Sequence, residues 1–398
     1  MSRSGADQTM NDLSARPVAD QFEKVLMEAK QTYRFGFVLT TAAGNMTRYQ
    51  NLRKYADREP GVECIWAPVK HYLEPNPFRF LPSPLRNRAV VMREAEPVMR
   101  QAGSLDAIMF HAFEPYVLSV LRHKGNQKPL VVWSQDNPPR SEHTSEPKCG
   151  SVHARSVWRR HLRYRFDRWC AQRTGLFLPF SKWAGDILVD ECGIPAEKVC
   201  PIHVGLDLEL WPHRLLEGDL RRPQILFVGG DFQRKGGDLL LKVYTEQFAD
   251  TADLHLVTKQ PPTGLPPQVH IYTDLSASDP RLRALYAQAD LFVLPTRDDM
   301  SSWVALEAMA TGRPVITTRM GGIPDIVRHG ETGLLIEPDD AVALAEAMRT
   351  LLGDSNLRRS MGVAGHAVVE RDFNASVCVP RILSVMKQAV AATSSRER

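Results

Sequence analysis

The sequence predicts an α/β protein made of two Rossmann-like domains, each with a parallel β-sheet. Short apolar runs alternate with longer stretches of helical periodicity along most of the 398 residues, and such alternation is typical of parallel, doubly wound sheets. A polar stretch rich in turn formers interrupts it at 216–223, Leu-Glu-Gly-Asp-Leu-Arg-Arg-Pro. The chain is also too long for one ordinary core. We therefore expect two α/β domains joined by a short linker.

The first domain is expected at 33–215, after a polar arm. Residues 1–32 lack periodicity at their start, and we interpret them as a mobile N-terminal arm with one helix near 18–30. Apolar runs predict strands at 35–39, 108–110, 130–133 and 176–178, with a helix lined by Tyr49, Leu52 and Tyr55 after the first. The Pro-rich segment 74–84 is predicted as a loop, because proline fits neither a helix interior nor a central strand.

The second domain is expected at 222–373. Its strands are predicted from apolar runs at 225–228, 253–257, 269–272, 291–294 and 315–317. A final helix is predicted from about 375 to 391, within a C-terminal segment at 374–398.

The bulk composition is that of a soluble globular protein, with 43% apolar and 24% charged residues. No run of 18 or more apolar residues occurs, and the N-terminus lacks the apolar core of a signal peptide, so we expect a cytoplasmic protein. The net charge of +4 does not demand nucleic acid binding. The six cysteines form no C-x-x-C pair, which favours a reduced compartment without structural zinc.

The most informative segment is 295–316, where Asp299 and Glu307 are eight residues apart. It follows the apolar run 291–294 and reads as an acidic loop, a helix and the next strand. Met300 to Ser302 then lie at a helix N-terminus, where free amides and the helix dipole bind phosphate. Glu307 is expected about two turns into the helix, roughly 9 Å along its axis. Two carboxylates flanking an anion site suit a nucleotide sugar, which has a diphosphate between two hydroxylated rings.

A second segment, 228–237, is a Gly-rich turn after a predicted strand and carries Arg234 and Lys235. Main-chain amides at Gly229 and Gly230 and the two cations can reach a diphosphate together. This segment therefore predicts the phosphate side of the same site.

The segment 295–316 resembles the E-x7-E signature of the retaining glycosyltransferases of family 4, with Asp299 in the place of the first Glu. Further motifs match in the family's order at 181–184, 202–207, 227–237, 321–327 and 331–336. The resemblance covers about 35–373. It implies the GT-B fold, in which two Rossmann-like domains with parallel sheets face a central cleft, and a C-terminal helix at 374–398 that crosses back to the first domain.

The resemblance also implies residue roles. Lys235 corresponds to the family's phosphate lysine, Glu307 to the carboxylate that binds the ribose, and Asp299 to the one that holds hydroxyls of the transferred sugar. His111 ends a strand in the family's D-V-x-x-x-H element, beside the donor sugar. The predicted catalytic residues are Lys235, Asp299 and His111. The predicted substrate-binding residues are Gly44, Gly229, Gly230, Arg234, Met300, Ser301, Ser302, Glu307 and Gly322.

The chain departs from the family pattern at three of these positions. Gly230 stands where the family often has Arg, so we expect Arg234 to supply the second cation. Asp299 is one methylene shorter than Glu, which puts its reach to the sugar in question. Ser302 stands where many relatives have Gly, so its hydroxyl is expected to replace a bare amide contact.

Each assignment has a structural alternative. These are a solvated basic turn for Arg234 and Lys235, a buried structural ion pair for Glu307, a plain acidic turn for Asp299 with Asp298 competing for its role, tight turns at Gly44 and at Gly321-Gly322, and a satisfied structural histidine for His111.

The segment 153–169 is strongly basic and places Trp158, Leu162, Phe166 and Trp169 at helical spacing. A cationic amphipathic helix can lie on an anionic membrane, so peripheral contact with such a membrane is one interpretation. The alternative is a solvated basic face over ordinary core, as in family members. Nucleic acid is the weakest reading, because the basic residues are confined to one helix.

The resemblance implies a retaining, hexosyltransferase-type glycosyltransferase (EC 2.4) that uses no metal and no organic cofactor. The donor is a nucleotide sugar, and the acceptor is a hydroxyl on a glycan or lipid, as in bacterial surface polysaccharide or glycolipid synthesis. Two alternatives stay open, a nucleotide-sugar 2-epimerase and a non-catalytic nucleotide-sugar binder. A dehydrogenase fits less well, because no G-x-G-x-x-G follows the first strand of either domain.

Overall fold

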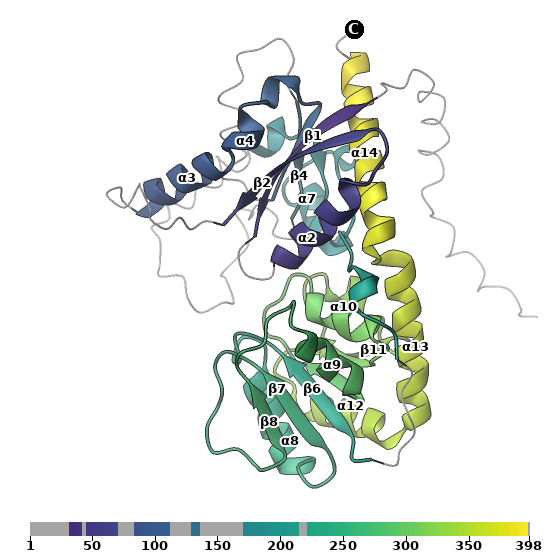
Figure 1. Ribbon diagram of the computed structural model, residues 1–398. Coiled ribbons are helices and arrows are strands. Elements are labelled where there is room, and N and C mark those ends of the chain that lie inside the picture. The colour runs from purple at the N-terminus through teal and green to yellow at the C-terminus, as the bar shows by residue number, and fades with distance from the viewer. Residues whose placement is uncertain are drawn as a thin grey trace, which may run out of the picture.

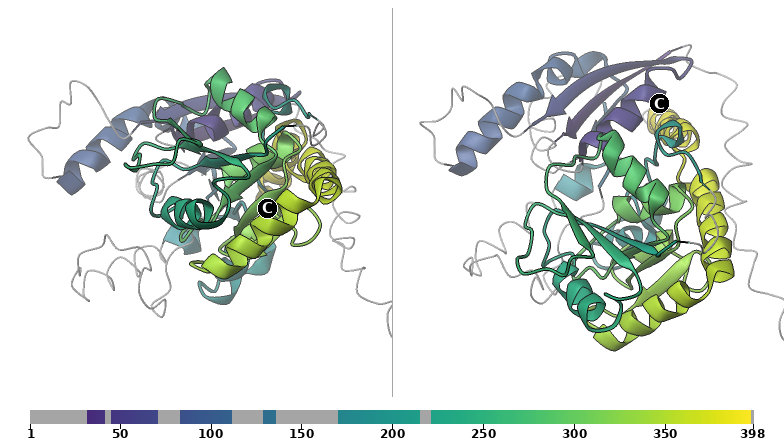
Figure 2. Two further views of the ribbon diagram at one scale, coloured as in Figure 1. Left: turned by 90° about the horizontal axis from the view of Figure 1, so that it is seen from below. Right: turned by 60° about the horizontal axis from the view of Figure 1, so that its bottom comes forward.

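The computed structural model describes residues 32–41, 45–70, 83–111, 129–135, 170–214 and 221–396. Within them the chain forms two parallel β-sheets, one above the other in Figure 1. In Figure 2 the purple elements of the first domain and the green elements of the second form separate groups, with the yellow C-terminal helices alongside them. The expectations for Gly44, the arm at 1–31, the Pro-rich residues 74–82 and the basic segment 153–169 lie outside the described residues.

The first sheet has five strands in the order β2-β1-β3-β4-β5, all parallel. The strands are β1 (Tyr33–Thr40), β2 (Val62–Val69), β3 (Ala107–Phe110), β4 (Leu130–Trp133) and β5 (Leu176–Phe177). The helices described in this part are α2 (Asn45–Ala56), α3 (Ser83–Glu94), α4 (Glu96–Met99) and α7 (Lys182–Asp190).

Helices cover this sheet on both faces. Along β1, Phe35, Phe37 and Leu39 enter a core shared with α2 and with the C-terminal helix, whereas Val38 enters a core shared with α3 and α4. Side chains of a strand alternate between the two faces, so each apolar neighbour in a continuous run finds its own core. Burial of each such side chain contributes about 2 kcal/mol.

The second sheet has six strands in the order β11-β10-β9-β6-β7-β8, all parallel. Its strands are β6 (Gln224–Val228), β7 (Asp253–Val257), β8 (Val269–Tyr272), β9 (Leu291–Leu294), β10 (Val315–Thr318) and β11 (Gly333–Ile336). Its helices are α8 (Gly237–Gln247), α9 (Pro280–Gln288), α10 (Trp303–Ala310), α11 (Ile323–Ile326), α12 (Ala341–Gly353) and α13 (Ser355–Asp372).

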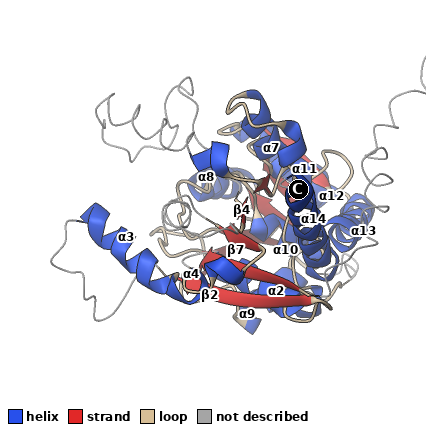
Figure 3. Ribbon diagram, turned by 90° about the horizontal axis from the view of Figure 1, so that it is seen from above, coloured by secondary structure: helices blue, strands red, loops and turns tan. Residues whose placement is uncertain are grey.

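The last helix, α14 (Ala375–Arg396), returns to the first sheet, as the resemblance implied. It lies beside α2 in Figures 1 and 3 and contacts it along its length. Its inward residues, such as Val379, Ile382 and Met386, are fully buried in the first domain's core. By length and composition α14 is also the one described helix apolar enough to cross a membrane. A third of this stretch is buried inside the protein, on the face that packs against the first domain's core.

Three features of the fold differ from the sequence prediction. The strand β2 was not predicted, because Glu63 and Pro68 interrupt its apolar pattern; both are tolerated because β2 is the edge strand of its sheet. The segment 333–336 was recognised only as part of a motif and forms the edge strand β11. Finally, α3 begins at Ser83, inside the segment predicted as a loop.

Candidate functional site

The two loops that carry the predicted chemistry lie side by side. The strand β6 pairs with β7 on one side and with β9 on the other. From β6 the sheet is extended on one side by β7 and β8, and on the other side by the later strands β9, β10 and β11. The strand order thus reverses between β6 and β9, and ligands bind outside the carboxyl ends of strands at such a switch point. Lys235 is on the loop after β6, and Asp299 is on the loop after β9.

Lys235 and Asp299 contact each other at this position. The Nζ of Lys235 donates a hydrogen bond to Oδ2 of Asp299 at 2.5 Å, and the two side chains are 14% and 13% exposed. Charge-assisted hydrogen bonds are among the strong ones. The sequence assigned both residues to one site but did not predict that they pair. Asp299 rather than its neighbour Asp298 is therefore the carboxylate at the lysine.

Glycines shape the loop around Lys235. Gly236 has φ 73°, in the left-handed region, and a Cβ there would collide with the main-chain oxygen of Pro295. A Cβ at Gly229 would lie 2.9 Å from Cβ of Lys235. At Gly230 a Cβ would meet nothing within 4 Å. The first two glycines thus serve packing, whereas Gly230 borders open space in which a ligand can approach the backbone.

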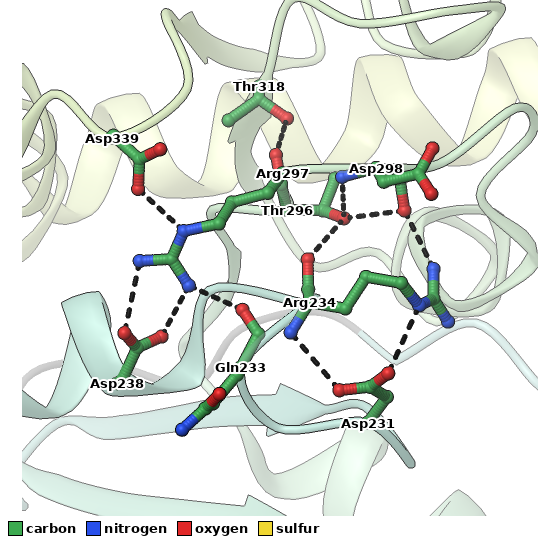
Figure 4. A network of polar contacts seen from close by, with 9 residues as sticks. All are labelled: Asp231, Gln233, Arg234, Asp238, Thr296, Arg297, Asp298, Thr318 and Asp339. Carbon is green, nitrogen blue, oxygen red and sulfur yellow. Dashed lines mark hydrogen bonds and ion pairs between the residues drawn. The ribbon is translucent and has the colours of Figure 1, made fainter. Parts of the chain in front are cut away.

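Arg297 fastens the two loops together (Figure 4). Its Nη1 and Nη2 donate to the two oxygens of Asp238 at 2.6 and 3.0 Å, and its Nε donates to Oδ1 of Asp339 at 2.6 Å. Nη1 also donates to the main-chain oxygen of Gln233, and the Arg297 amide donates to the oxygen of Arg234 at 2.9 Å. Arg297 is not among the predicted site residues, because an arginine in an acidic loop has no sequence pattern that reveals its partners.

The second predicted cation, Arg234, is held within the protein. Its Nη1 donates to the main-chain oxygen of Asp298 at 2.7 Å, and its Nε lies 3.4 Å from Oδ2 of Asp231 (Figure 4). These contacts give Arg234 a role in joining the loops. Its contact with a donor phosphate stays a prediction.

The N-terminus of α10 presents polar groups next to the ion pair. Ser302 is the N-cap residue, and its hydroxyl makes no capping hydrogen bond. Within the described residues the hydroxyls of Ser301 and Ser302 are buried and have no hydrogen-bond partner. An N-cap serine normally accepts from a first-turn amide. Uncommitted hydroxyls at a helix N-terminus, where the dipole favours anions, suit a phosphate. Met300, just before them, is 37% exposed.

Glu307 is the fifth residue of α10, so it lies about one turn from the helix N-terminus rather than the two that were expected. Its side chain is 4% exposed, and its Oε2 accepts a hydrogen bond from Oη of Tyr286 at 2.8 Å. Burial raises the pKa of Glu307 to about 7, against the opposing effect of the Tyr286 hydrogen bond. The partner of Glu307 is a neutral tyrosine, so the two residues do not form an ion pair. The contact of Glu307 with the ribose stays a prediction.

The raised pKa predicts a pH dependence of stability. The folded protein binds a proton at Glu307 that the unfolded chain releases, so the contribution of Glu307 to the free energy of unfolding falls as pH rises from 4.5 through 7. Each pKa unit corresponds to about 1.4 kcal/mol. Glu307→Gln, which is neutral at every pH, should therefore melt at a higher temperature than the wild type at pH 8 and at a similar temperature at pH 4.5.

The quantity to compare between pH values is the difference in melting temperature between Glu307→Gln and the wild type. The buried His203, with a pKa lowered to about 3 by burial, changes the stability of both proteins in the opposite direction as pH falls. Glu246→Gln, at an exposed position of α8, is the matched control and should show no pH-dependent difference. A variant of Glu307 that is less stable at both pH values would contradict the burial argument.

The turn at Gly321-Gly322 approaches the Asp299 loop closely. Gly321 has φ 53°, and a Cβ there would lie 2.6 Å from the main-chain oxygen of Asp299. The amide of Gly322 donates to the oxygen of Met300 at 2.8 Å, and a Cβ at Gly322 would collide with the side chain of Ser181. These glycines are therefore needed for packing of protein against protein. A ligand contact at Gly322 stays a prediction.

The two domains meet beside this turn. Ser181 accepts a capping hydrogen bond from the amide of Ala184 at 3.2 Å, and the preceding helical amide, of Trp183, donates to Oδ2 of Asp325 at 3.2 Å. The His203 ring packs against Trp303, the first residue of α10, with centroids 4.7 Å apart. The motif at 181–184 thus binds the second domain at the edge of the site.

In the first domain, His111 follows β3 and is 6% exposed. Its amide donates to Val38 at 3.2 Å, and within the described residues its Nδ1 is buried without a hydrogen-bond partner. No hydrogen bond or ion pair in the described part of the chain joins it to Lys235 or Asp299. Its place beside the donor sugar stays a prediction.

Comparison with known proteins supports the resemblance for the second domain. Residues 222–354 match the family described as Glycosyl transferases group 1. Over 167 residues the chain is 34% identical to a D-inositol 3-phosphate glycosyltransferase of Corynebacterium diphtheriae, a match that covers 38% of this chain and 39% of that protein. The chain therefore spans well under two thirds of that relative.

Solved structures confirm the GT-B fold. Sucrose-phosphate synthase from Thermosynechococcus elongatus superposes with a TM-score of 0.72 at 18% identity, over 90% of this chain and 100% of that one. HepE of Anabaena in complex with UDP-glucose superposes with a TM-score of 0.61 at 17% identity, over 91% and 99% of the two chains. At such identities the likeness concerns the fold alone.

Proposed function

Because residues 222–354 match the family described as Glycosyl transferases group 1, we propose that this protein is a retaining glycosyltransferase. It moves a sugar from a nucleotide-sugar donor to a hydroxyl acceptor. The observation that carries the proposal is the meeting of Lys235 and Asp299 at the switch point of the second sheet, next to the uncommitted hydroxyls of Ser301 and Ser302.

Each group has a role suited to its charge. Lys235 and the α10 N-terminus face the diphosphate and offset the negative charge that grows on the leaving group as the bond from phosphate oxygen to sugar carbon breaks. Asp299 accepts hydrogen bonds from sugar hydroxyls. The acceptor oxygen attacks the same face of the sugar, and its proton passes to the departing phosphate oxygen, so no dedicated nucleophile is needed.

The donor class is supported by one neighbour. The structure of HepE holds UDP-glucose, a nucleotide sugar with the diphosphate that the site of this chain is suited to bind. We propose a hexose as the transferred sugar and a glycan or lipid-linked hydroxyl as the acceptor, in bacterial surface polysaccharide or glycolipid synthesis. No metal or organic cofactor is part of this proposal, and full transfer activity in EDTA would support that point.

A thermal-shift screen tests the proposal and identifies the base. UDP, GDP and ADP, each with its glucose or mannose conjugate, are added to the purified protein. One base is expected to raise the melting temperature, because binding to the folded state alone stabilises it. Release of the nucleoside diphosphate only when an acceptor is present then separates transfer from epimerisation and from mere binding. Absence of any shift at millimolar ligand would contradict the proposed function.

Localisation rests on the sequence. We propose a cytoplasmic protein in peripheral contact with the inner face of an anionic membrane through the basic segment 153–169, which lies outside the described residues. Cationic side chains near such a surface contribute about 1 kcal/mol each. Sedimentation with anionic vesicles at low salt, lost on changing Arg159, Arg160 and Arg163 to Gln, tests the contact; a wild type that does not sediment removes it.

A further inference from the structure

The ion pair of Lys235 and Asp299 engages two side chains that the proposed function assigns to the ligand. In the proposed function Lys235 faces phosphate and Asp299 faces sugar, yet in the structure the two side chains bond to each other at 2.5 Å. Both are more than four-fifths buried, at 14% and 13% exposure. Solvent screening between them is therefore weak, and a ligand must compete with this bond before it can use either group.

The positions of Lys235 and Asp299 are fixed by contacts between their two loops. Arg297 and Gly236 hold the β6 and β9 loops in fixed contact through Asp238 and Pro295. The lysine and the carboxylate consequently cannot separate by loop drift without breaking those contacts. Only rotation of the two side chains opens the pair. In this arrangement the Asp299 carboxylate binds the Nζ of Lys235, the same atom that a phosphate oxygen of the donor would bind.

We propose that Asp299 acts as an internal competitor for Lys235, which makes the site select the complete nucleotide sugar over the free nucleoside diphosphate. This inference rests on the proposed function. A complete donor supplies a phosphate to Lys235 and sugar hydroxyls to Asp299, so both members of the broken pair regain partners. A nucleoside diphosphate supplies only the phosphate.

The free nucleoside diphosphate therefore leaves Asp299 without a partner. A largely buried carboxylate that loses its cation is costly, and it also repels the phosphate that replaced it on the lysine. The same asymmetry favours departure of the nucleoside diphosphate after transfer, because the lysine regains Asp299 as the product leaves. The shorter Asp in place of the family's Glu is what pairs with Lys235 in this chain.

Asp299→Asn tests the proposal, since Asn keeps the size of the side chain and removes its charge. Affinities for UDP and UDP-glucose, or for the pair with the base selected in the screen, are measured by titration calorimetry. The variant should bind the nucleoside diphosphate about tenfold more tightly than the wild type. Its affinity for the nucleotide sugar should not improve, because the sugar loses its charged acceptor. The selectivity ratio should fall by about the same factor.

Two further variants isolate the pair. Asp298→Asn makes the same charge change one residue away. Asp298 binds Arg234 through its main-chain oxygen and not through its side chain. This variant should leave the selectivity ratio unchanged. In a Lys235→Gln background, Asp299→Asn should no longer tighten nucleoside diphosphate binding, since the competition needs the lysine. Asp299→Ser, which also removes the charge, replaces Asp299→Asn if that variant melts at a lower temperature than the wild type.

The outcomes separate the two proposals. If the wild type binds none of UDP, GDP and ADP and none of their sugar conjugates, the proposed function fails. If the wild type binds them but Asp299→Asn binds the nucleoside diphosphate no more tightly than the wild type, the internal competition is wrong while the proposed function stands. If Asp298→Asn increases the affinity for the nucleoside diphosphate as much as Asp299→Asn does, the effect comes from the net charge of the loop. That result would also overturn the proposal.

Discussion

Lys235→Ala is expected to lower turnover by about two orders of magnitude or more while the fold survives. The reason is that the lost cation acts on charge that grows in the transition state, so its removal affects the chemical step more than ground-state binding. Asp299 loses its partner in this variant, but its side chain lies on a loop that Arg297 still fastens to α8 through Asp238.

Turnover is measured as acceptor-dependent release of the nucleoside diphosphate, with the melting curve as the check on folding. Lys242→Ala, at an exposed lysine on α8, is the matched control and should retain full activity. The double variant Lys235→Ala with Asp299→Asn removes the unpaired charge and should stay inactive. An unchanged rate in Lys235→Ala would remove the lysine from the site.

Gly236→Ala is expected to be the most destabilising small change at the site, lowering the free energy of unfolding by more than about 2 kcal/mol and the melting temperature by about 5 °C. Two independent costs add. An alanine at φ 73° is strained, and its Cβ would collide with the oxygen of Pro295, a main-chain atom that cannot rotate away. The loops of Lys235 and Asp299 must then separate, so nucleotide binding should weaken as well.

Gly230→Ala provides the contrast within the same loop. A Cβ there would meet no atom within 4 Å, so the melting temperature should match that of the wild type. The methyl group would project into open space beside the pair, and nucleotide affinity should fall if a ligand occupies that space. Equal melting temperatures for Gly236→Ala and the wild type, measured by calorimetry, would show that the loop contact can relax.

Central strands and edge strands differ in how far the sequence predicts them. The run Leu291–Leu294 is fully buried in the middle of its sheet, and a continuous apolar run is what such a strand requires. The edge strand β2 is mostly half-buried, with Glu63 and Pro68 exposed, and it shows no clear apolar period. An apolar run predicts a buried strand most directly, although the edge strand β8 was also predicted while only partly buried.

The sequence by itself determined the α/β class and most strand positions, and it predicted the residues of the candidate site, because periodicity, glycines and the spacing of Asp299 and Glu307 are local properties of the chain. Only the tertiary structure decided that Lys235 pairs with Asp299 across 64 residues, that Tyr286 bonds to Glu307, and that Arg297 joins the two loops. The physical reason is that strand order places distant loops in contact, and the partner of a buried charge is set by what the fold brings to it rather than by its neighbours in sequence.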